Sequence, residues 1–351
     1  MNVSDAKRAL DSVITKSRVH FYKPIQVAEI LFRDRVYGGI GLADLSTYRT
    51  MSKKWRDAIC EQFLGRVSTS SAKYQDDIFS ATAIPPEVLV VLGEENRQKG
   101  GIVEAYIYNK FKERFSQMSD GLNYCQSHDK TNFNLKEFLN LFWNEPGLRR
   151  SIDKIYEIVV YSIFSALVDA LQITIKVRFN PGKNDVFLDF EDFTTKVLDL
   201  SLDKIFVEFP ARINRVGVTN AADRGLDMFS NFGLAIQIKH LSLTEDLAEG
   251  IITSVSADRI VIVCKDAEEK VILSLLNQIG WKARIQSIIT ENELIAWYEK
   301  ALRGRFAYLI GDNILNLLNS EIQVEFPATK ESEFEEFYSK RGYNKLSDIN
   351  W

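Results

Sequence analysis

The run DRIVIVCK at residues 258–265 constrains the fold more than any other stretch of the chain. It is dense in β-branched residues and does not alternate with polar ones, which is typical of a strand buried on both faces of a sheet. Helical patterns lie on both sides of it, at 244–257 and 266–280, and a further strand and helix are expected at 282–289 and 290–304. This alternation predicts a sheet that is flanked by helices.

Upstream of this alternation, the sequence predicts a meander of strands. The apolar stretch 151–171 has the pattern of a long helix, and QITIKVRF at 172–179 alternates as a half-buried strand does. Two strand-like runs follow at 225–233 and 234–243, while residues 180–222 are expected to form an insertion that holds one helix. A meander followed by alternation predicts an α/β (α+β) fold with a mixed sheet.

The first part of the chain is predicted to be mainly helical. Ser4 is the expected N-cap of the first helix, and the pair Gly100-Gly101 is expected to separate two later ones. The organisation that we expect is therefore a mainly helical region, a mixed-sheet core and a C-terminal extension, at residues 1–150, 151–310 and 311–351.

The composition excludes several classes of protein. No apolar run reaches the roughly 18 residues that span a bilayer, and the charged N-terminus is not a secretory signal. Cys60, Cys125 and Cys264 are odd in number and far apart, which argues against a disulfide framework and against a thiolate zinc site. With 3 histidines in the chain, a His-rich metal site is nearly excluded. A cytoplasmic protein without a membrane partner is expected.

Positive charge gathers at the start of the chain. The formal net charge is -4, yet residues 1–60 carry eleven Lys and Arg against six Asp and Glu. Lys53, Lys54 and Arg56, which surround Trp55, are the candidates for contacts with the phosphates of DNA. The alternative is a solvated helical surface.

An amide and an ammonium group lie two residues apart in the strand LAIQIKHLSL at 234–243. Residues i and i+2 of a strand share a face, so Gln237 and Lys239 point to the same side. If the run that holds Asp227 pairs with this strand, a carboxylate joins them at one edge of the sheet. A carboxylate and a neutral oxygen can hold Mg²⁺, and a lysine can orient water or stabilise charge on a phosphate. The trio predicts metal-assisted phosphodiester hydrolysis; the alternative is a sheet edge with solvated polar side chains.

The spacing of Asp227, Gln237 and Lys239 follows that of the PD-(D/E)XK nucleases, with GLD in place of the proline motif and Gln in place of the more frequent Glu. That core needs a helix, a meander of three strands, a second helix and another strand, and the expected elements follow this order. Glu157 is an isolated acid in the apolar helix 151–171, where either a metal or the surface must explain it. It is the candidate third metal ligand.

A second match to the same letters exists at Asp258, Glu268 and Lys270. It is rejected on geometry, because Glu268 and Lys270 open a predicted helix, on which residues i and i+2 do not face each other. Acidic residues there are better explained as favourable charge near a helix N-terminus.

The loop at 214–225 offers side chains that suit phosphates or base edges. Arg215, Asn220 and Arg224 are the candidate DNA contacts in it, and His240 beside the lysine of the strand is a fourth. The alternative is a polar surface loop.

Two long stretches, DAKRALDSVITKSRVHFYKPIQVAEIL at 5–31 and VGVTNAADRGLDMFSNFGLAIQIKHLSL at 216–243, resemble the HaeII family of type II restriction endonucleases. The resemblance extends over the whole chain. It implies a Mg²⁺-dependent enzyme that cuts duplex DNA at a short palindrome, RGCGCY in this family, and that is paired with a cytosine methyltransferase. A palindrome presents two identical half-sites, so a homodimer is expected. The alternatives are a non-catalytic DNA-binding protein on a decayed nuclease fold and a soluble helical scaffold.

Overall fold

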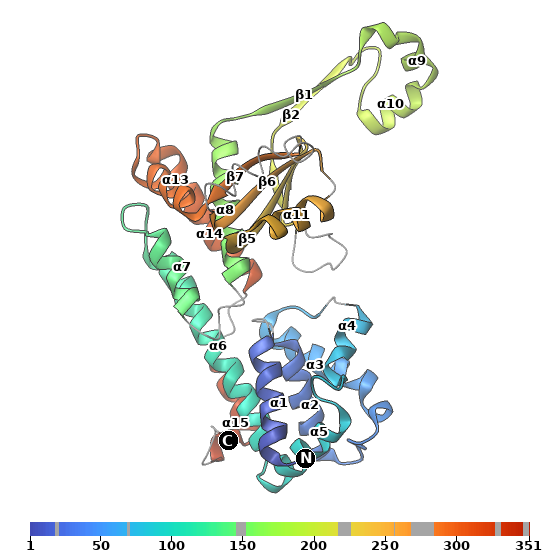
Figure 1. The fold of residues 1–351 in the computed structure, drawn as a ribbon, viewed down its shortest axis with the longest axis vertical. Helices are drawn as coiled ribbons and strands as arrows, with labels where there is room; N and C mark the ends of the chain where they lie inside the picture. Colours follow the sequence, from blue (N-terminus) through green and yellow to red (C-terminus); the bar gives the residue numbers. More distant parts are fainter. Residues whose placement is uncertain are drawn as a thin grey trace. The chain divides into compact units, whose positions relative to one another are not determined.

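The computed structural model describes residues 1–17, 21–68, 71–144, 152–216, 226–255, 257–267, 284–326, 331–346 and 351 (Figure 1). These residues group into two compact units. The helical unit contains residues 1–158 and 318–351, and the sheet unit contains residues 159–216 and 226–317. The C-terminal segment therefore belongs to the same unit as the N-terminus.

The helical unit is an assembly of amphipathic helices, as the sequence predicts. Its helices are α1 (Val3–Lys16), α2 (Tyr22–Tyr37), α3 (Arg49–Leu64), α4 (Ala72–Asp76), α5 (Pro86–Gln98), α6 (Ile102–Ser127), α7 (Leu135–Asn144), the start of α8 (Ile152–Ala170), the end of α14 (Ala307–Glu325) and α15 (Glu331–Lys340). The expected cap of α1 is wrong by two residues, because the side chain of Asn2, not Ser4, accepts a hydrogen bond from the Asp5 amide. The expected break at Gly100-Gly101 is confirmed, and Gly101 has a φ of 104°, which favours glycine.

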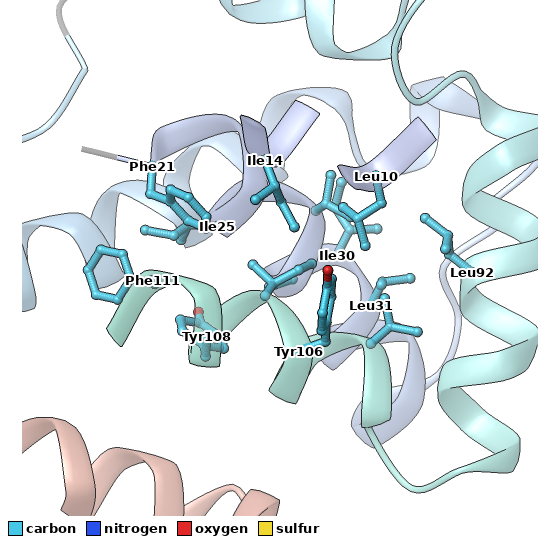
Figure 2. Packing of buried hydrophobic residues seen from close by; sticks show 14 of the residues in the cluster. Leu10, Ile14, Phe21, Ile25, Ile30, Leu31, Leu92, Tyr106, Tyr108 and Phe111 are labelled. Carbon is cyan, nitrogen blue, oxygen red and sulfur yellow. The ribbon is translucent and has the colours of Figure 1, made fainter. Parts of the chain in front are cut away.

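One hydrophobic core holds this unit together (Figure 2). Leu10 and Ile14 of α1 pack with Ile30 of α2 and with Tyr106 and Phe111 of α6. The aromatic residues of the C-terminal helix complete the same core, namely Phe334, Phe337 and Tyr338. Residues 331–337 are rich in glutamate, yet the phenylalanines among them form an apolar helix face that packs in this core.

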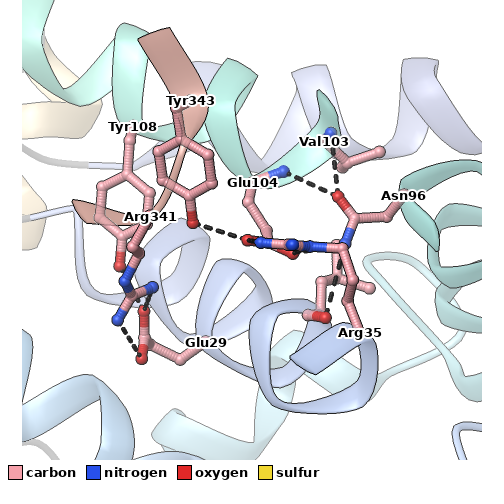
Figure 3. A network of polar contacts seen from close by, with 9 residues as sticks. Glu29, Arg35, Asn96, Val103, Glu104, Tyr108, Arg341 and Tyr343 are labelled. Atoms are coloured by element: carbon pink, nitrogen blue, oxygen red, sulfur yellow. Dashed lines mark hydrogen bonds and ion pairs between the residues drawn. The ribbon is translucent and has the colours of Figure 1, made fainter. Parts of the chain in front are cut away.

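A buried polar network joins the two ends of the chain (Figure 3). Arg341 donates to both carboxylate oxygens of Glu29, at 2.5 and 3.1 Å, and the hydroxyl of Tyr108 donates to the same carboxylate at 2.6 Å. Glu104 accepts in turn from Arg35 and from the Tyr343 hydroxyl. Each buried carboxylate therefore has a cation and a tyrosine as partners, which is what the burial of charge requires.

The sheet unit contains the predicted mixed sheet. Its strands are β3 (Ile213–Arg215), β4 (Met228–Ser230), β5 (Leu234–Leu243), β6 (Arg259–Ala267) and β7 (Ile285–Thr290), in this spatial order. The first three form an antiparallel meander, and β6 and β7 add to it in parallel. Residues 260–264 of β6 are buried throughout, as their composition predicts.

Helices connect and cover these strands. α11 (Glu245–Ser254) begins after β5 with Thr244 as the expected cap, and α13 (Glu291–Arg303) follows β7 with a capping box of Thr290 and Glu293. Ala248 and Ile251 of α11 pack on the sheet in a core with residues of β5 and β6. Among the described residues, no helix has the length and apolarity that crossing a membrane demands.

The strand expected at 172–179 exists but lies outside the mixed sheet. It is β1 (Thr174–Arg178), which pairs with β2 (Phe206–Pro210) in a separate two-stranded sheet. Between these strands lie α9 (Asn184–Asp189) and α10 (Glu191–Leu198), so the insertion is bounded by 173 and 211 and not by the expected 180–222. We call residues 173–211 the arm (Figure 1). The first strand of the meander is β3, within the stretch that was expected to be a loop.

Candidate active site

The hairpin of β4 and β5 brings a carboxylate and an amide together. Its turn ends at Gly233, whose φ of 84° favours glycine, and the amides of Phe232 and Leu234 donate to the Ser230 side chain. The resulting register pairs Met228 with Ile236. Because antiparallel partners run in opposite directions, Asp227 comes to lie opposite Gln237.

The side chain of Asp227 is fixed by two donors. Its Oδ2 atom accepts a hydrogen bond from the Gln237 side-chain amide and another, of 2.8 Å, from the Ile238 backbone amide. Gln237 is only 2% exposed, so its side-chain NH₂ group cannot donate to bulk water and needs an acceptor within the protein, which Asp227 provides. The sequence predicts the roles of Asp227 and Gln237 but not that of the Ile238 amide. This amide lies beyond the Met228–Ile236 pair of the hairpin and donates to the Asp227 side chain.

Lys239 lies two residues further along β5, on the same face as Gln237, and is partly buried. Its register partner on β6 is Cys264. Within the described part of the chain, Lys239 has no hydrogen-bond or ion-pair partner. An ammonium group without a carboxylate partner is suited to meet an anion that comes from outside, such as a phosphate.

Cys264, next to Lys239 in the sheet, is not a competing nucleophile. It is fully buried, and this burial raises the pKa of its thiol to about 12. The group is therefore a neutral thiol at physiological pH, and thiols ligate metals and attack substrates only as thiolates. The chemistry of this part of the sheet rests on oxygen and nitrogen groups.

Glu157, the expected third ligand, lies on α8 and is 3% exposed. Its carboxylate accepts a hydrogen bond of 2.6 Å from Lys154, one turn earlier. It belongs to the helical unit, whereas Asp227 and Gln237 belong to the sheet unit. Its role towards a metal remains a prediction.

His240 is buried on the opposite face of β5 from Lys239. It is 4% exposed, and its Nε2 atom lies 3.0 Å from a carboxylate oxygen of Glu291, the first residue of α13. The structure thus argues against the expected DNA contact by His240, because its ring faces a helix and not solvent. The pair instead links the end of β5 to the start of α13.

The other candidate DNA contacts of the sheet unit are placed only in part. Arg215 lies in strand β3, not in a loop, and is partly buried. Asn220 and Arg224 lie outside the described residues, and so do Glu268 and Lys270 of the rejected motif.

The basic side chains of α3 have different surroundings from one another. Lys54 is exposed, and Lys53 forms an ion pair of 2.7 Å with Asp76. Arg56 is 2% exposed and donates to Asp57, Gln26 and Gln75. The structure therefore argues against a phosphate contact by Arg56, since its guanidinium is occupied inside the helical unit.

Comparison with known proteins gives a consistent result. A family model described as HaeII restriction endonuclease matches residues 6–343. The type II restriction enzyme HaeII of Haemophilus aegyptius is 60% identical over 348 residues, which are 99% of each chain. The type II restriction enzyme NgoBI of Neisseria gonorrhoeae is 59% identical over 342 residues, which are 97% of this chain and 96% of the relative. No solved structure matches this chain.

Proposed function

Because the chain belongs to the HaeII restriction endonuclease family and is a type II site-specific deoxyribonuclease, we propose that Asp227, Gln237 and Lys239 form its active site. We propose that this site hydrolyses phosphodiester bonds of duplex DNA with Mg²⁺, on a core of the PD-(D/E)XK type. The family membership favours this activity over the alternatives of a decayed, non-catalytic binder and of a helical scaffold.

The observation that carries the proposal is the contact of Asp227 with Gln237 and Ile238. It puts the acid at the start of one strand beside the amide of the next, with Lys239 on the same face as that amide. A side-chain amide as buried as that of Gln237, in the central strand of the sheet, is unusual unless it has a hydrogen-bond partner. The meander, the helix α11 and the parallel strand β6 follow in the order that such a nuclease core requires.

Asp227 and Gln237 fit a hard divalent cation. Carboxylate and amide oxygens are ligands that Mg²⁺ accepts, and this ion keeps several water molecules and uses one or two carboxylates together with substrate phosphates. The described residues contain no group of three or more His, Cys, Asp or Glu that could hold a metal. Asp227 and Gln237 would hold the ion.

The side chains have distinct tasks in the proposed reaction. When bound, the ion supplies charge that polarises the phosphate and lowers the pKa of a bound water molecule. Asp227 is held in one orientation by its two donors, so it needs no rearrangement to accept a ligand. Lys239 offers a positive charge to the phosphate oxygens while one P–O bond forms to water and the P–O bond to the leaving oxygen breaks.

We further propose the properties that follow from the resemblance. These are a palindromic target of the RGCGCY type, a homodimer on DNA, a cognate cytosine methyltransferase that acts on the same site, and a cytoplasmic location. Digestion of DNA of known sequence, followed by mapping of the fragment ends, tests the target. Fragments that end at unrelated sequences would refute it.

Cleavage of a supercoiled plasmid tests the active site. Asp227→Asn and Lys239→Ala are each expected to lower the rate by orders of magnitude, because they remove a metal ligand and a charge that stabilises the transition state. The matched controls, Asp258→Asn and Lys176→Ala, change exposed residues outside the site and are expected to retain the rate.

Three outcomes would contradict this assignment. Near-normal turnover by Asp227→Asn or Lys239→Ala in a folded protein would move the site elsewhere. Equal cleavage with Mg²⁺ and with excess EDTA would exclude the metal. Retention of DNA without cutting by the unchanged chain would favour the non-catalytic alternative.

A separate measurement tests the proposed phosphate contacts of α3. Lys54→Ala is expected to weaken binding to all DNA sequences alike and to reduce the slope of log K against log salt by about 1. Lys340→Ala, which changes another exposed lysine, is the matched control. If Lys54→Ala leaves the slope of log K against log salt unchanged, α3 is a solvated helical surface and does not contact phosphates.

A further inference from the structure

The ribbon of the arm has one apolar face that no described residue covers. In its antiparallel register Ile175 pairs with Phe209 and Val177 with Val207, and directly opposed residues share a face. Val177 and Phe209 are 38% and 36% exposed, and Ile173, next along this face, is 41% exposed. The face is therefore an uninterrupted patch of large apolar side chains in contact with solvent.

The other face of the same ribbon has the chemistry of a normal protein surface. It carries Thr174, Arg178 and the opposite charges of Lys176 and Glu208, which are register partners. The ammonium of Lys176 also lies 3.8 Å from the ring centroid of Phe206. Phe206 is the register partner of Arg178, so this face is mixed in character, whereas the first face is apolar throughout. Because a two-stranded sheet without a packing partner is marginal in water, the ribbon needs a cover.

Helix α10, in the same arm, shows the same mismatch. Phe190, the N-cap residue, and Phe193 and Val197 within the helix follow one another at helical spacing and are 57%, 50% and 63% exposed. The buried residue of this helix is Thr194. A surface helix of a complete fold turns its apolar stripe inward, so α10 also lacks a partner.

The size of this surface suits a stable protein interface. The apolar ribbon face and the stripe of α10 together expose six large apolar side chains: Ile173, Val177, Phe190, Phe193, Val197 and Phe209. Roughly 450 Å² of apolar surface results if aromatic rings have about 200 Å² each and aliphatic side chains about 100 Å² each, of which about half is exposed. One side of a standard interface buries about 800 Å², of which a little over half is apolar, so this surface has about the apolar area that such an interface requires.

The charge of the arm argues against DNA as its partner. Residues 173–211 contain five Lys and Arg and seven Asp and Glu, an excess of two negative charges. A surface that follows a phosphate backbone needs the opposite sign. The partner must be apolar, and a protein surface meets this requirement.

We infer that the arm is the homodimer contact, with the apolar ribbon face and α10 packed on the arm of a second copy of this chain. The inference rests on the proposed function, because a palindromic target calls for two copies related by a twofold axis. A twofold contact buries the same patch on both copies, so one apolar face is sufficient for self-association. The charged face of each ribbon remains in solvent.

Analytical ultracentrifugation of the full chain without DNA tests the inference. The unchanged chain is expected to be a dimer, and Val177→Lys/Phe209→Lys is expected to weaken dimerisation at least about 100-fold, because it places charges inside the contact. The control Thr174→Lys/Glu208→Gln changes the net charge by the same +2, through one added positive and one removed negative charge on the other face of the same ribbon, and is expected to leave the dimer intact. Circular dichroism and thermal melting establish that both variants are folded.

Cross-linking gives a measurement that does not depend on a disruptive variant. Single cysteines at Ile175, Val177 and Phe209 are expected to give a disulfide-linked dimer from at least one position, whereas one at Thr174 gives none. The native cysteines do not interfere, because each is buried and burial raises its pKa.

The results that would overturn the inference are distinct. They are a monomeric unchanged chain with and without a palindromic duplex, a dimer that survives Val177→Lys/Phe209→Lys, and cross-links only from Thr174. Weaker DNA binding by that variant at an unchanged oligomeric state would assign the arm to DNA and also overturn it.

Plasmid cleavage separates a failure here from a failure of the proposed function. If the unchanged chain dimerises through the arm but does not cleave with Mg²⁺, the proposed function fails and the arm contact stands. If it cleaves but its dimer is insensitive to the apolar face, the arm contact fails and the function stands. If both hold, the monomeric variant is expected to nick one strand before it cuts the other.

Discussion

Replacement of Gln237 by glutamate probes the candidate site with the smallest change that the chain allows. Gln237→Glu keeps the shape and volume of the side chain and exchanges an NH₂ group for an oxygen. The NH₂ group donates to Asp227, and Gln237 as a whole is 2% exposed. The variant therefore turns a hydrogen bond into a contact of two carboxylates without creating a cavity.

The size of the effect follows from two limits. Loss of a hydrogen bond to a charged group lowers the free energy of unfolding by about 1.5–3 kcal/mol. The repulsion adds to this loss, but it cannot exceed the free energy of placing a proton on the new carboxyl, which is about 4 kcal/mol at pH 7. Without a divalent cation, Gln237→Glu is expected to lower the stability of the sheet unit by about 2–4 kcal/mol at pH 7.

This loss depends on pH in a defined direction. The neighbouring Asp227 and burial both raise the pKa of the introduced carboxyl above that of an unfolded glutamate. The folded state then binds the proton more tightly, so the stability is fully present in acid and is lost as the pH rises. Below about pH 4 the carboxyl carries its proton, can donate it to Asp227 as the amide does, and leaves little difference from the unchanged protein.

Urea unfolding followed by circular dichroism, at pH 4 and pH 7 and with and without Mg²⁺, measures these terms. Mg²⁺ is expected to stabilise Gln237→Glu more than the unchanged chain, because two carboxylates bind a divalent cation more tightly than a carboxylate and an amide. Gln323→Glu makes the same exchange at an exposed position of α14 and is the matched control. An equal loss at both pH values would refute the electrostatic argument, and an absent loss at pH 7 would refute the contact.

Two further predictions concern other parts of the chain. Arg341→Met leaves the buried carboxylate of Glu29 without its cation and is expected to destabilise the helical unit by about 3–5 kcal/mol. The control Lys340→Met, at an exposed ion pair, is expected to change stability by less than about 1 kcal/mol. Equal midpoints of urea unfolding for the two variants would contradict this. Glu268→Ala and Lys270→Ala are each expected to retain plasmid cleavage, because they alter only the start of an expected helix; a folded but inactive protein would make the rejected motif the site.

Local patterns predicted much of the sheet unit. β5 has the bounds of the run LAIQIKHLSL, and β6 is buried along the stretch that its β-branched residues indicate. The meeting of Asp227 and Gln237 follows from the two-residue period of a strand and from the glycine turn at Gly233. Periodicity and turn chemistry act within a few residues, so a single sequence reveals them.

Other features depend on partners that are distant in the sequence. The alternation at 172–179 indicates a strand with one apolar face, but it does not say which strand lies beside it or what covers it. Likewise, Arg56 and His240 are polar residues that are buried. Their side chains contact Gln26 and Glu291, which lie on other elements. Composition assigns such residues to the surface, and only the packed chain shows that their polar groups have internal partners.

The link between Glu29 and Arg341 has a consequence for the order of events during synthesis. The two residues are 312 positions apart, so at a translation rate of about 5–20 residues per second roughly 15–60 s pass between their appearance. Throughout this interval the carboxylate of Glu29 lacks its cation. The N-terminal helices thus gain this buried ion pair only after Arg341 has left the ribosome, when the candidate active site has already been translated.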